Sequence, residues 1–306
     1  EKVPNEIITD NFPLDRGKIN AREGGVRVPL IITGPDVNRG KESNVMINGL
    51  DFYPTILSWT GTQQPQSVKL DGCDISTLLR ENPNNGALVR EKNGEVRNSM
   101  VWHFPHGVAQ QSTLRRGGWK LIYNYMPGRP EVELFKLYEK YPNPSKRVDI
   151  EEAENLAKQF PKRAKSMRKE LFDRLDAMNA SYPYLNPAYK GALKGKAEIC
   201  KVIEAGKKEN SVWVRFKENG NKITSGQIVY TLNGGEKSEE WYTSPASVTG
   251  DRLHGTLPKG STHYFFNLVD DKNFLISHPV PMDMLAAGKT RPKGMYSLDA
   301  LPASLH

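Results

Sequence analysis

Apolar and polar positions follow two different patterns along this chain, and the change of pattern near residue 190 predicts two domains. Up to about residue 190, helical spacing is mixed with runs typical of buried strands, which predicts an α/β layered domain. Beyond residue 197, short alternating runs are separated by turn residues, which predicts a small all-β sandwich of the immunoglobulin- or fibronectin-like kind. We therefore expect an α/β part over residues 1–190, a linker over 191–196, a β-sandwich domain over 197–282 and a tail over 283–306.

In the first part, the clearest helix covers residues 162–179, where Met167, Leu171, Leu175 and Met178 share one face. Its polar face reads as plain solvent exposure. A second helix is predicted over residues 52–59, between a capping Asp51 and a terminating glycine. Strands are predicted over residues 26–33 and 133–138, and a hairpin over residues 112–125 with its turn at 117–118.

In the second part, the alternation predicts six strands, over residues 197–205, 212–217, 227–232, 241–248, 252–258 and 262–269. Asn-Gly turns at 219–220 and 233–235 separate some of them. Large aromatic residues could form a platform that stacks on sugars, but packing in the core of a small sandwich is the better interpretation for most of them. They are Trp213, Trp241, Tyr242, Tyr264, Phe265 and Phe266.

The composition favours an anionic partner. The formal net charge is +8 and the isoelectric point is about 9.2, which suits nucleic acid, anionic polysaccharide, or sulfated or phosphorylated small molecules. Nucleic acid is disfavoured, because the basic residues are dispersed and no recognition motif is present. No run approaches 18 apolar residues, so we expect no membrane span. Cys73 and Cys200 are too far apart to make a metal-ligand pair.

Residues 13–29, which read P-L-D-R-G-K-I-N-A-R-E-G-G-V-R-V-P, bring cations and glycines together just before the predicted strand over 26–33. Such a loop could bind an anion, with Lys18 as a compact point charge and Arg22 or Arg27 as a forked donor. Gly24 and Gly25 allow a tight turn or a close approach of the backbone. On spacing alone, a solvated basic loop remains the simpler interpretation.

This segment resembles formylglycine-dependent (type I) sulfatases, whose pattern is approximately N-x-P-L-R-G-G-K-x-x-x-x-E-G-G-x-R-V-P. The matching positions are Asn11, Pro13, Leu14, Gly17, Lys18, Glu23, Gly24, Gly25, Arg27, Val28 and Pro29. In that family the lysine of the Gly-Lys pair reaches the sulfate group, so the resemblance implies that Lys18 is catalytic. The chain departs from the pattern at Asp15 and Arg16, where Arg-Gly is usual, and this puts the local shape of the loop in question.

Further matches follow in the family's order up to about residue 190. D-F-Y-P-T-I-L-S-W-T-G at 51–61 and the segment around 70–79 resemble scaffold elements, and R-R-G-G-W-K-L-I at 115–122 resembles the family's small antiparallel C-terminal sheet. The resemblance implies the C-terminal part of an alkaline phosphatase-like α/β sulfatase domain, with that sheet and a terminal helix. Arg115 could reach substrate from this sheet, although a solvated arginine at a strand end is the simpler interpretation.

M-V-W-H-F-P-H-G at 100–107 resembles a W-H-x-P-H element of glycan and aryl sulfatases. His103 and His106 are badly spaced for zinc, because Pro105 prevents a helix there. Two interpretations stay open. Either both imidazoles line the substrate pocket, or His103 is an aromatic residue at the edge of the core and His106 caps a turn.

The resemblance also implies components that this sequence lacks. The sulfatase nucleophile is a formylglycine made from a Cys/Ser-x-Pro-x-Arg motif, which is absent, and so is the carboxylate cluster that binds calcium (Ca2+). Asp10 and Asn11 do not qualify as metal ligands, since calcium needs six or more oxygen ligands. We expect no metal ligand in this chain. The chain reads as a fragment that is inactive without the N-terminal part of the sulfatase domain.

The leading hypothesis is therefore a sulfuric ester hydrolase acting on a sulfated small molecule or polysaccharide, such as a glycan or aryl sulfate, in the periplasm or outside the cell. Lys18 is the catalytic residue, and His103, His106, Arg22 and Arg115 contact substrate. One alternative is a phosphodiesterase or phosphonate hydrolase of the same superfamily. Another is a non-catalytic glycan-binding protein that uses the β-sandwich.

Overall fold

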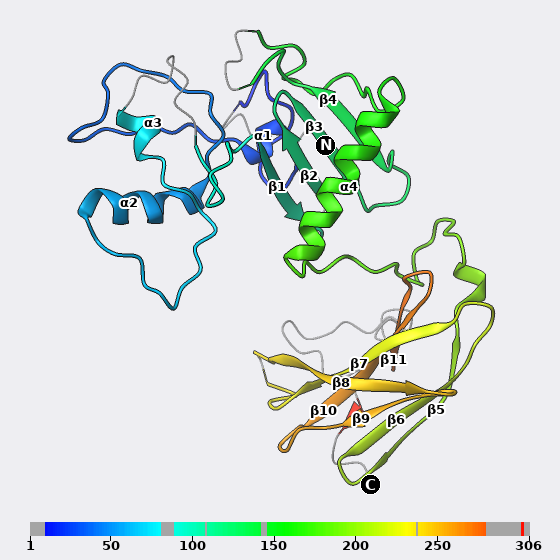
Figure 1. Ribbon diagram of the computed structural model, residues 1–306. Coiled ribbons are helices and arrows are strands. Elements are labelled where there is room, and N and C mark those ends of the chain that lie inside the picture. Colours follow the sequence, from blue (N-terminus) through cyan, green and yellow to red (C-terminus); the bar gives the residue numbers. More distant parts are fainter. Residues whose placement is uncertain are drawn as a thin grey trace. The chain divides into compact units, whose positions relative to one another are not determined.

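The chain folds into two compact units, Glu1–Pro183 and Tyr184–His306 (Figure 1). The structure, a computed structural model, describes residues 10–80, 89–107, 109–141, 146–236 and 238–279, together with the backbone of Leu301–Pro302. Most of the predicted tail over 283–306 lies outside these residues. Among the residues described, no helix is long and apolar enough to cross a membrane.

The N-terminal unit contains a four-stranded antiparallel sheet in the order β1-β2-β3-β4. Its strands are β1 (Ser99–Phe104), β2 (Gln111–Arg116), β3 (Trp119–Asn124) and β4 (Val132–Lys136). The predicted hairpin is confirmed, with Gly117 at a φ of 55° in its turn. Beside it, a side chain on Gly118 would collide with the carbonyl group of Tyr138, so the backbone can approach closely only at glycine.

Helix α4 (Pro161–Ala177) packs on one face of this sheet (Figure 1). The strands contribute Leu114, Leu121 and Leu134 to the shared core, and the helix contributes Ala164, Met167, Leu171 and Leu175. Three of the four predicted helix positions are therefore buried. Met178 is 60% exposed, because the helix has already ended at Ala177.

The opposite face of the sheet is covered by the N-terminal loop and by α1 (Glu23–Val26), a helix of one turn. Residues that alternate with the α4-facing positions point to this side, among them Lys120, Ile122 and Asn124. Ile122 packs with Phe135, while the other two are polar. The two faces of one small sheet thus have different chemistry: an apolar face under α4 and a largely polar face under α1.

The strand predicted over residues 26–33 is not formed. Residues 23–26 make α1, and residues 27–33 have no regular structure, with Val28 83% exposed and Ile31 88% exposed. A strand needs a neighbour to accept its backbone hydrogen bonds, and no described residue pairs with this segment. The β-branched composition alone was therefore not enough to predict a strand here, because it says nothing about a pairing neighbour.

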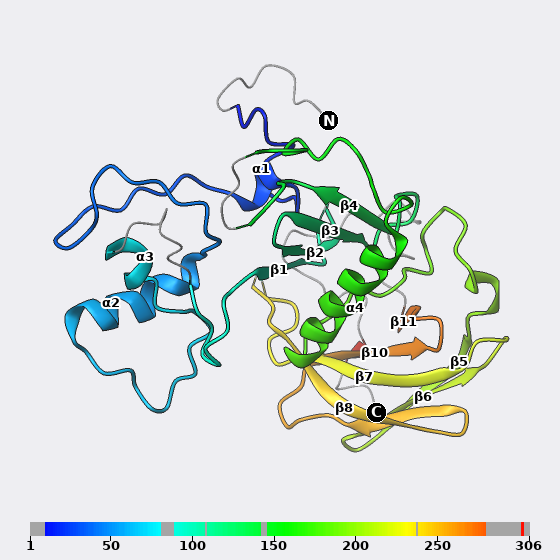
Figure 2. The same cartoon turned by 45° about the horizontal axis from the view of Figure 1, so that its top comes forward.

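Between this segment and β1 lie η1 (Gly49–Asp51), α2 (Phe52–Thr60) and α3 (Ser76–Arg80), of which α2 and α3 lie side by side in Figures 1 and 2. Gly61 ends α2 at a φ of 65°, as predicted. The expected cap is different, since the side chain of Asp51 makes no capping bond to α2. Its carboxylate instead accepts two bonds from Arg97, of 2.7 and 2.9 Å, and one from the backbone of Cys73. This buried pair ties α2 to the start of the sheet.

The C-terminal unit has seven strands on one antiparallel path, in the order β11-β10-β7-β8-β9-β6-β5, and β12 (Leu301–Pro302) pairs with β10. β8 belongs to two sheets, because its first half pairs with β7 and its second half with β9. Side chains from both sheets share one core, including Val214, Ile228 and Phe266. The strands are β5 (Lys201–Lys208), β6 (Ser211–Lys217), β7 (Ile223–Thr231), β8 (Trp241–Thr249), β9 (Arg252–Thr256), β10 (His263–Asp270) and β11 (Leu275–His278).

Each of the six predicted strands of this unit therefore overlaps an observed one, whereas β11 was missed because it is only four residues long. Of the aromatic residues considered for a sugar platform, Tyr264 and Phe266 are buried in the core. Trp213 packs across the position of Gly206, with the guanidinium of Arg252 4.6 Å from its ring. The assignment of this unit to the immunoglobulin- or fibronectin-like class stays a prediction.

Replacing Leu171 by Ala is expected to lower the free energy of unfolding of the N-terminal unit by about 2–5 kcal/mol, because a fully buried side chain leaves a cavity under α4. Met178→Ala, at the exposed residue just after the end of α4, is the control and should change it by less than about 0.5 kcal/mol. Chemical denaturation followed by circular dichroism measures both. Equal losses would mean that α4 is not held by this face.

Candidate functional site

The loop that carries Lys18 folds back onto α1 through two glycines. A side chain on Gly24 would collide with the carbonyl groups of Asp15 and Arg16, and one on Gly25 with those of Gly17 and Asn20. The amide of Gly24 also donates to the carbonyl of Asp15 at 3.0 Å. The two glycines of the E-G-G sequence thus let the backbone of α1 approach residues 15–20 closely, and this contact holds the loop against the helix.

Lys18 lies between two residues in the left-handed region of the backbone. Arg16 has a φ of 63° and Ile19 a φ of 68°, a costly conformation for a β-branched residue. Arg16 occupies the position at which the family pattern has glycine, so the loop keeps a glycine-like conformation despite the substitution. The side chain of Lys18 is exposed, and its ammonium group bonds to no residue within the described ranges.

A chain of hydrogen bonds anchors this loop at one end of the sheet. The amide of Ala21 donates to Oε1 of Gln111 at 3.2 Å, and Nε2 of Gln111 donates to Asn124 at 2.8 Å. Asn124 donates in turn to Glu133 at 2.9 Å, and Glu133 pairs with Arg22 at 2.5 Å. Since β2 begins at Gln111, the loop lies at the end of the sheet where the turn from β1 to β2 is found.

Arg22 and Arg115 are both occupied inside the fold. Besides Glu133, Arg22 donates to the carbonyl of Glu152 at 3.0 Å, and its guanidinium lies 4.6 Å from the centre of the Phe135 ring. Arg115 is buried, 3.8 Å from the carboxylate of Glu23. Their contact with substrate stays a prediction. In this geometry they hold the loop and the sheet together.

Lys120 is the centre of a buried charge cluster that the sequence did not reveal. Its ammonium group has no exposed surface and lies 2.9 Å from Glu23 and 3.0 Å from Glu152. Glu152 also accepts the backbone N–H of Glu23 at 2.6 Å. One cation therefore joins α1, β3 and the loop after β4. The only signal was the match of Glu23 and Lys120 to the family elements E-G-G and W-K-L-I, since a lysine on a strand normally points to solvent.

The two carboxylates of this cluster shift in opposite directions. Burial alone would raise the pKa of Glu23, but attraction to Lys120 and Arg115 outweighs it, and the pKa lies below its usual value. Burial raises the pKa of Glu152, and Lys120 offsets this only in part. The two pKa shifts differ because Glu23 has more cations around it than Glu152, including Arg27 at 3.5 Å. Glu23 is thus the better-compensated anion of the pair.

His103 lies on the α4 face of the sheet, not on the face of the Lys18 loop. Its Nε2 lies 2.9 Å from the carbonyl oxygen of Ser181, which can only accept, so Nε2 carries the proton. Nδ1 lies 2.6 Å from Oγ of Ser112, and the ring meets Tyr125 and Tyr182 edge-on. This geometry gives His103 a packing role, and its contact with substrate stays a prediction.

His106 is placed differently. It is exposed in the turn from β1 to β2, with its ring 4.3 Å from that of Phe104. That turn and the loop of Lys18 meet the same end of the sheet, through the bond between Ala21 and Gln111. Of the five predicted site residues, the structure therefore leaves Lys18 and His106 free to meet a ligand at one end of the sheet.

Neither a metal cluster nor an activated thiol is found among the described residues. No group of three or more His, Cys, Asp or Glu side chains there could hold a metal ion, so these residues do not fit the calcium site that the resemblance implies. Asp10 accepts the N–H of Phe12 and serves a local turn. Burial raises the pKa of both thiols, that of Cys200 to about 11, so neither is poised as a nucleophile.

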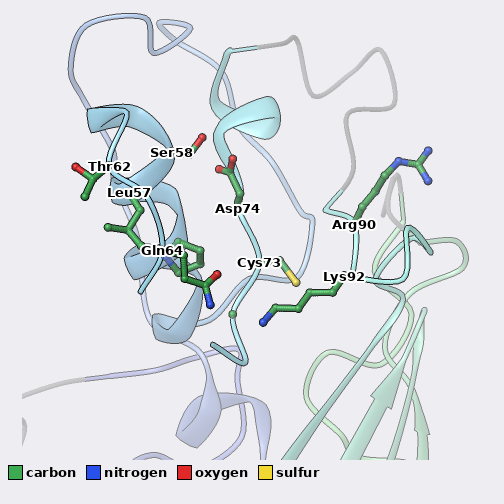
Figure 3. A pocket seen from close by; sticks show the side chains of 10 residues that line it. Leu57, Ser58, Thr62, Gln64, Cys73, Asp74, Arg90 and Lys92 are labelled. Atoms are coloured by element: carbon green, nitrogen blue, oxygen red, sulfur yellow. The ribbon is translucent and has the colours of Figure 1, made fainter. Parts of the chain in front are cut away.

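A hollow beside α2 is lined by none of the five predicted residues (Figure 3). Leu57 and Ser58 face it from α2, and Arg90 and Lys92 come from the opposite side. The ammonium group of Lys92 donates to the carbonyl of Leu70, and Cys73 also lines the hollow. Arg90 likewise donates to the carbonyl of Gly94, so both cations bond within the N-terminal unit. The side chains that line the hollow make no arrangement suited to acid–base chemistry.

Lys120→Met should lower the free energy of unfolding at neutral pH by about 3–5 kcal/mol, because Glu23 and Glu152 lose their shared cation while buried. Without it both pKa values rise in the folded state. A carboxyl group with a raised pKa loses its contribution to stability as pH rises through that pKa, so the deficit should be smaller near pH 4 than at pH 7. Denaturation at the two pH values checks this. A deficit independent of pH would contradict the charge argument.

Comparison with known proteins identifies the family. Residues 18–178, just over half of the chain, match the family model described as N-sulphoglucosamine sulphohydrolase, C-terminal. A protein named "Sulfatase" from Formosa agariphila is 33% identical over 143 residues, which cover 42% of this chain and 24% of the relative. "Arylsulfatase K" from Xenopus laevis is 28% identical over 156 residues, covering 50% of this chain and 27% of the relative.

"Steryl-sulfatase" from Homo sapiens is 36% identical over 64 residues, covering 21% of this chain and 11% of the relative. The matched segments span about a quarter of the length of the sulfatase from Formosa agariphila and of arylsulfatase K. The family model begins at Lys18 and ends just beyond α4, so it covers the sheet, the elements on both of its faces and the loop from Lys18 onward. The chain belongs to the sulfatase family, and its N-terminal unit is a C-terminal portion of a sulfatase.

Proposed function

We propose that this chain contributes the sulfate-contacting lysine, Lys18, to an enzyme that hydrolyses sulfate esters. The observation that carries the proposal is an exposed, unpaired ammonium group on a loop of constrained backbone, in a chain of the sulfatase family. The other basic residues of the loop are accounted for, except Arg16, since Arg22 and Arg27 pair with carboxylates. Lys18 has no such partner within the described part of the chain.

The chemistry asked of Lys18 is electrostatic. Cleavage of a sulfate ester develops negative charge on the sulfate oxygens and the leaving oxygen, and a positioned cation stabilises that charge more than it stabilises the substrate. An ammonium group on a fixed loop requires little reorganisation at the moment of reaction. The strained residue beside it, Ile19, is consistent with a loop whose shape is maintained for function. His106, at the same end of the sheet, would contact the leaving group or the rest of the substrate.

We propose that the nucleophile comes from a part of the complete enzyme outside this chain. The printed sequence has no Cys/Ser-x-Pro-x-Arg motif, and both of its thiols are buried. In the family, formylglycine supplies the nucleophile and calcium supplies positive charge next to it. This chain alone should then be inactive. A periplasmic or extracellular location, and a glycan or aryl sulfate as substrate, are further parts of the proposal that rest on the resemblance.

In the complete enzyme, Lys18→Ala should reduce kcat/KM for an aryl sulfate by about 10²–10³-fold, the usual effect of removing one oxyanion-stabilising group. Lys41→Ala, at another exposed lysine, is the control and should leave kcat/KM unchanged. Steady-state hydrolysis of matched sulfate and phosphate esters measures the effect and separates a sulfatase from a phosphodiesterase. An unchanged kcat/KM for Lys18→Ala would refute the site assignment.

Gly25→Ala tests the positioning of the loop rather than its charge. The added methyl group would lie 2.6 Å from the carbonyl oxygen of Gly17 and even closer to that of Asn20, so the loop must shift. We expect at least a tenfold fall in kcat/KM of the complete enzyme, since small misplacements of a catalytic group are costly. Gly49→Ala is the control, because its position is open. Thermal denaturation of both variants shows whether the loss exceeds any effect of unfolding, and equal activity would count against a positioned loop.

A further inference from the structure

The first turns of α4 carry a concentration of positive charge. Between Pro161 and Lys169 there are five cations and no acidic residue, whereas the acids of this helix come only from Glu170 onward. All five cations are exposed: Lys162, Arg163, Lys165, Arg168 and Lys169. A sequence with this density of basic residues over eight positions is of the kind that binds polyanions.

Helical spacing places three of these lysines in one row. Lys162, Lys165 and Lys169 are separated by three and four residues, so they share a face that extends over roughly 10 Å of the helix axis. With Ser166 and Phe172 they line a shallow hollow along the helix. The ammonium groups of Lys162 and Lys165 have no partner among the described residues, and Lys169 pairs only with exposed Asp173, at 2.6 Å. We call Lys162, Lys165 and Lys169 the lysine row.

The stability of the helix does not explain this arrangement. Cations near the beginning of a helix oppose its dipole, and like charges three or four residues apart repel each other. Phe160, at the N-cap, offers no side-chain hydrogen bond that would offset this. The buried face of α4 already accounts for its attachment to the sheet. The lysine row therefore costs the free chain some stability, and a bound polyanion would remove that cost.

The neighbouring arginines pack on aromatic rings, whereas Lys162 and Lys165 have no partner among the described residues and Lys169 pairs only with exposed Asp173. Arg163 packs 4.6 Å from the centre of the Trp119 ring, and Arg168 lies 5.2 Å from that of Tyr123 and pairs with Glu131. A lysine ammonium is a point charge on a flexible stem, without the fixed fork of arginine. A row of such groups suits anions repeated along a polymer, whose positions vary, better than one phosphate held in a fixed geometry.

We propose that the lysine row binds a sulfated polysaccharide chain at a surface separate from Lys18. α4 and the Lys18 loop pack on opposite faces of the same sheet, so a glycan held by α4 leaves the loop accessible. Nucleic acid is a poorer fit, since Arg168 packs against Phe172, 5.7 Å from the centre of the aromatic ring on which a base would stack. The choice of a sulfated rather than another anionic polymer rests on the proposed function.

Heparin binding by the full chain tests the proposal. We expect Lys162→Gln/Lys165→Gln/Lys169→Gln to weaken heparin affinity at least tenfold at physiological ionic strength, and to lower the slope of log Kd against log salt by about two to three, one for each lost contact. The matched control, Lys201→Gln/Lys208→Gln/Lys259→Gln, removes three exposed charges from the other unit and should stay within twofold. Circular dichroism shows that both variants are folded.

Unsulfated dextran and single-stranded DNA are the comparison ligands. Dextran should not bind, and DNA should bind more weakly than heparin. Equal losses in the two triple variants would overturn the proposal, because binding would then follow net charge alone. DNA bound as tightly as heparin through the same row would overturn it in favour of a nucleic-acid surface. The lysine-row variant is measured by heparin affinity and Lys18→Ala by kcat/KM for an aryl sulfate, so a failure of the sulfatase proposal and a failure of the lysine row give different results.

Discussion

The N-terminal unit depends on one buried lysine. Lys120 emerges from the middle of the sheet and meets Glu23 and Glu152, which belong to segments that are far apart in sequence. Burying an ammonium group is costly unless its charge is compensated, so each of the three side chains stabilises the unit only when the others are in place. Since Glu23 begins α1 and the Lys18 loop wraps around α1, the position of the exposed lysine is fixed by the buried one.

This arrangement explains why the predicted cations separate into two groups. Arg22 and Arg115 belong to the same internal network as Lys120, and their charges are already matched by carboxylates. Lys18 and the lysine row of α4 lie on the outside with charges largely unmatched. A high net positive charge by itself could not make this distinction. It is burial, and the presence or absence of a carboxylate within reach, that separates structural cations from those available to an anion.

Elements with strong local signals could be predicted from the sequence. The Gly117-Gly118 hairpin, the helix at 161–177 and the strands of the C-terminal unit follow from periodicity and turn residues, which depend on neighbours in sequence. The predicted strand at 26–33 failed because a strand is completed only by pairing, and its β-branched residues are exposed here. Lys120 was missed because nothing local distinguishes a buried strand lysine from a solvated one; only its two distant carboxylates do.

The case of His103 shows the same limit for the candidate site. Its motif was read as a strand end interrupted by a proline, and the resemblance of that motif to a sulfatase element suggested that His103 and His106 both line the substrate pocket. Alternation along β1 and β2 instead directs His103 toward Ser112 and the aromatic residues beside α4, while His106, beyond the strand, stays in solvent. Three residues of spacing across the end of a strand therefore separate a packed ring from an exposed one. For a site at the end of a sheet, the residue just past the strand is the better candidate.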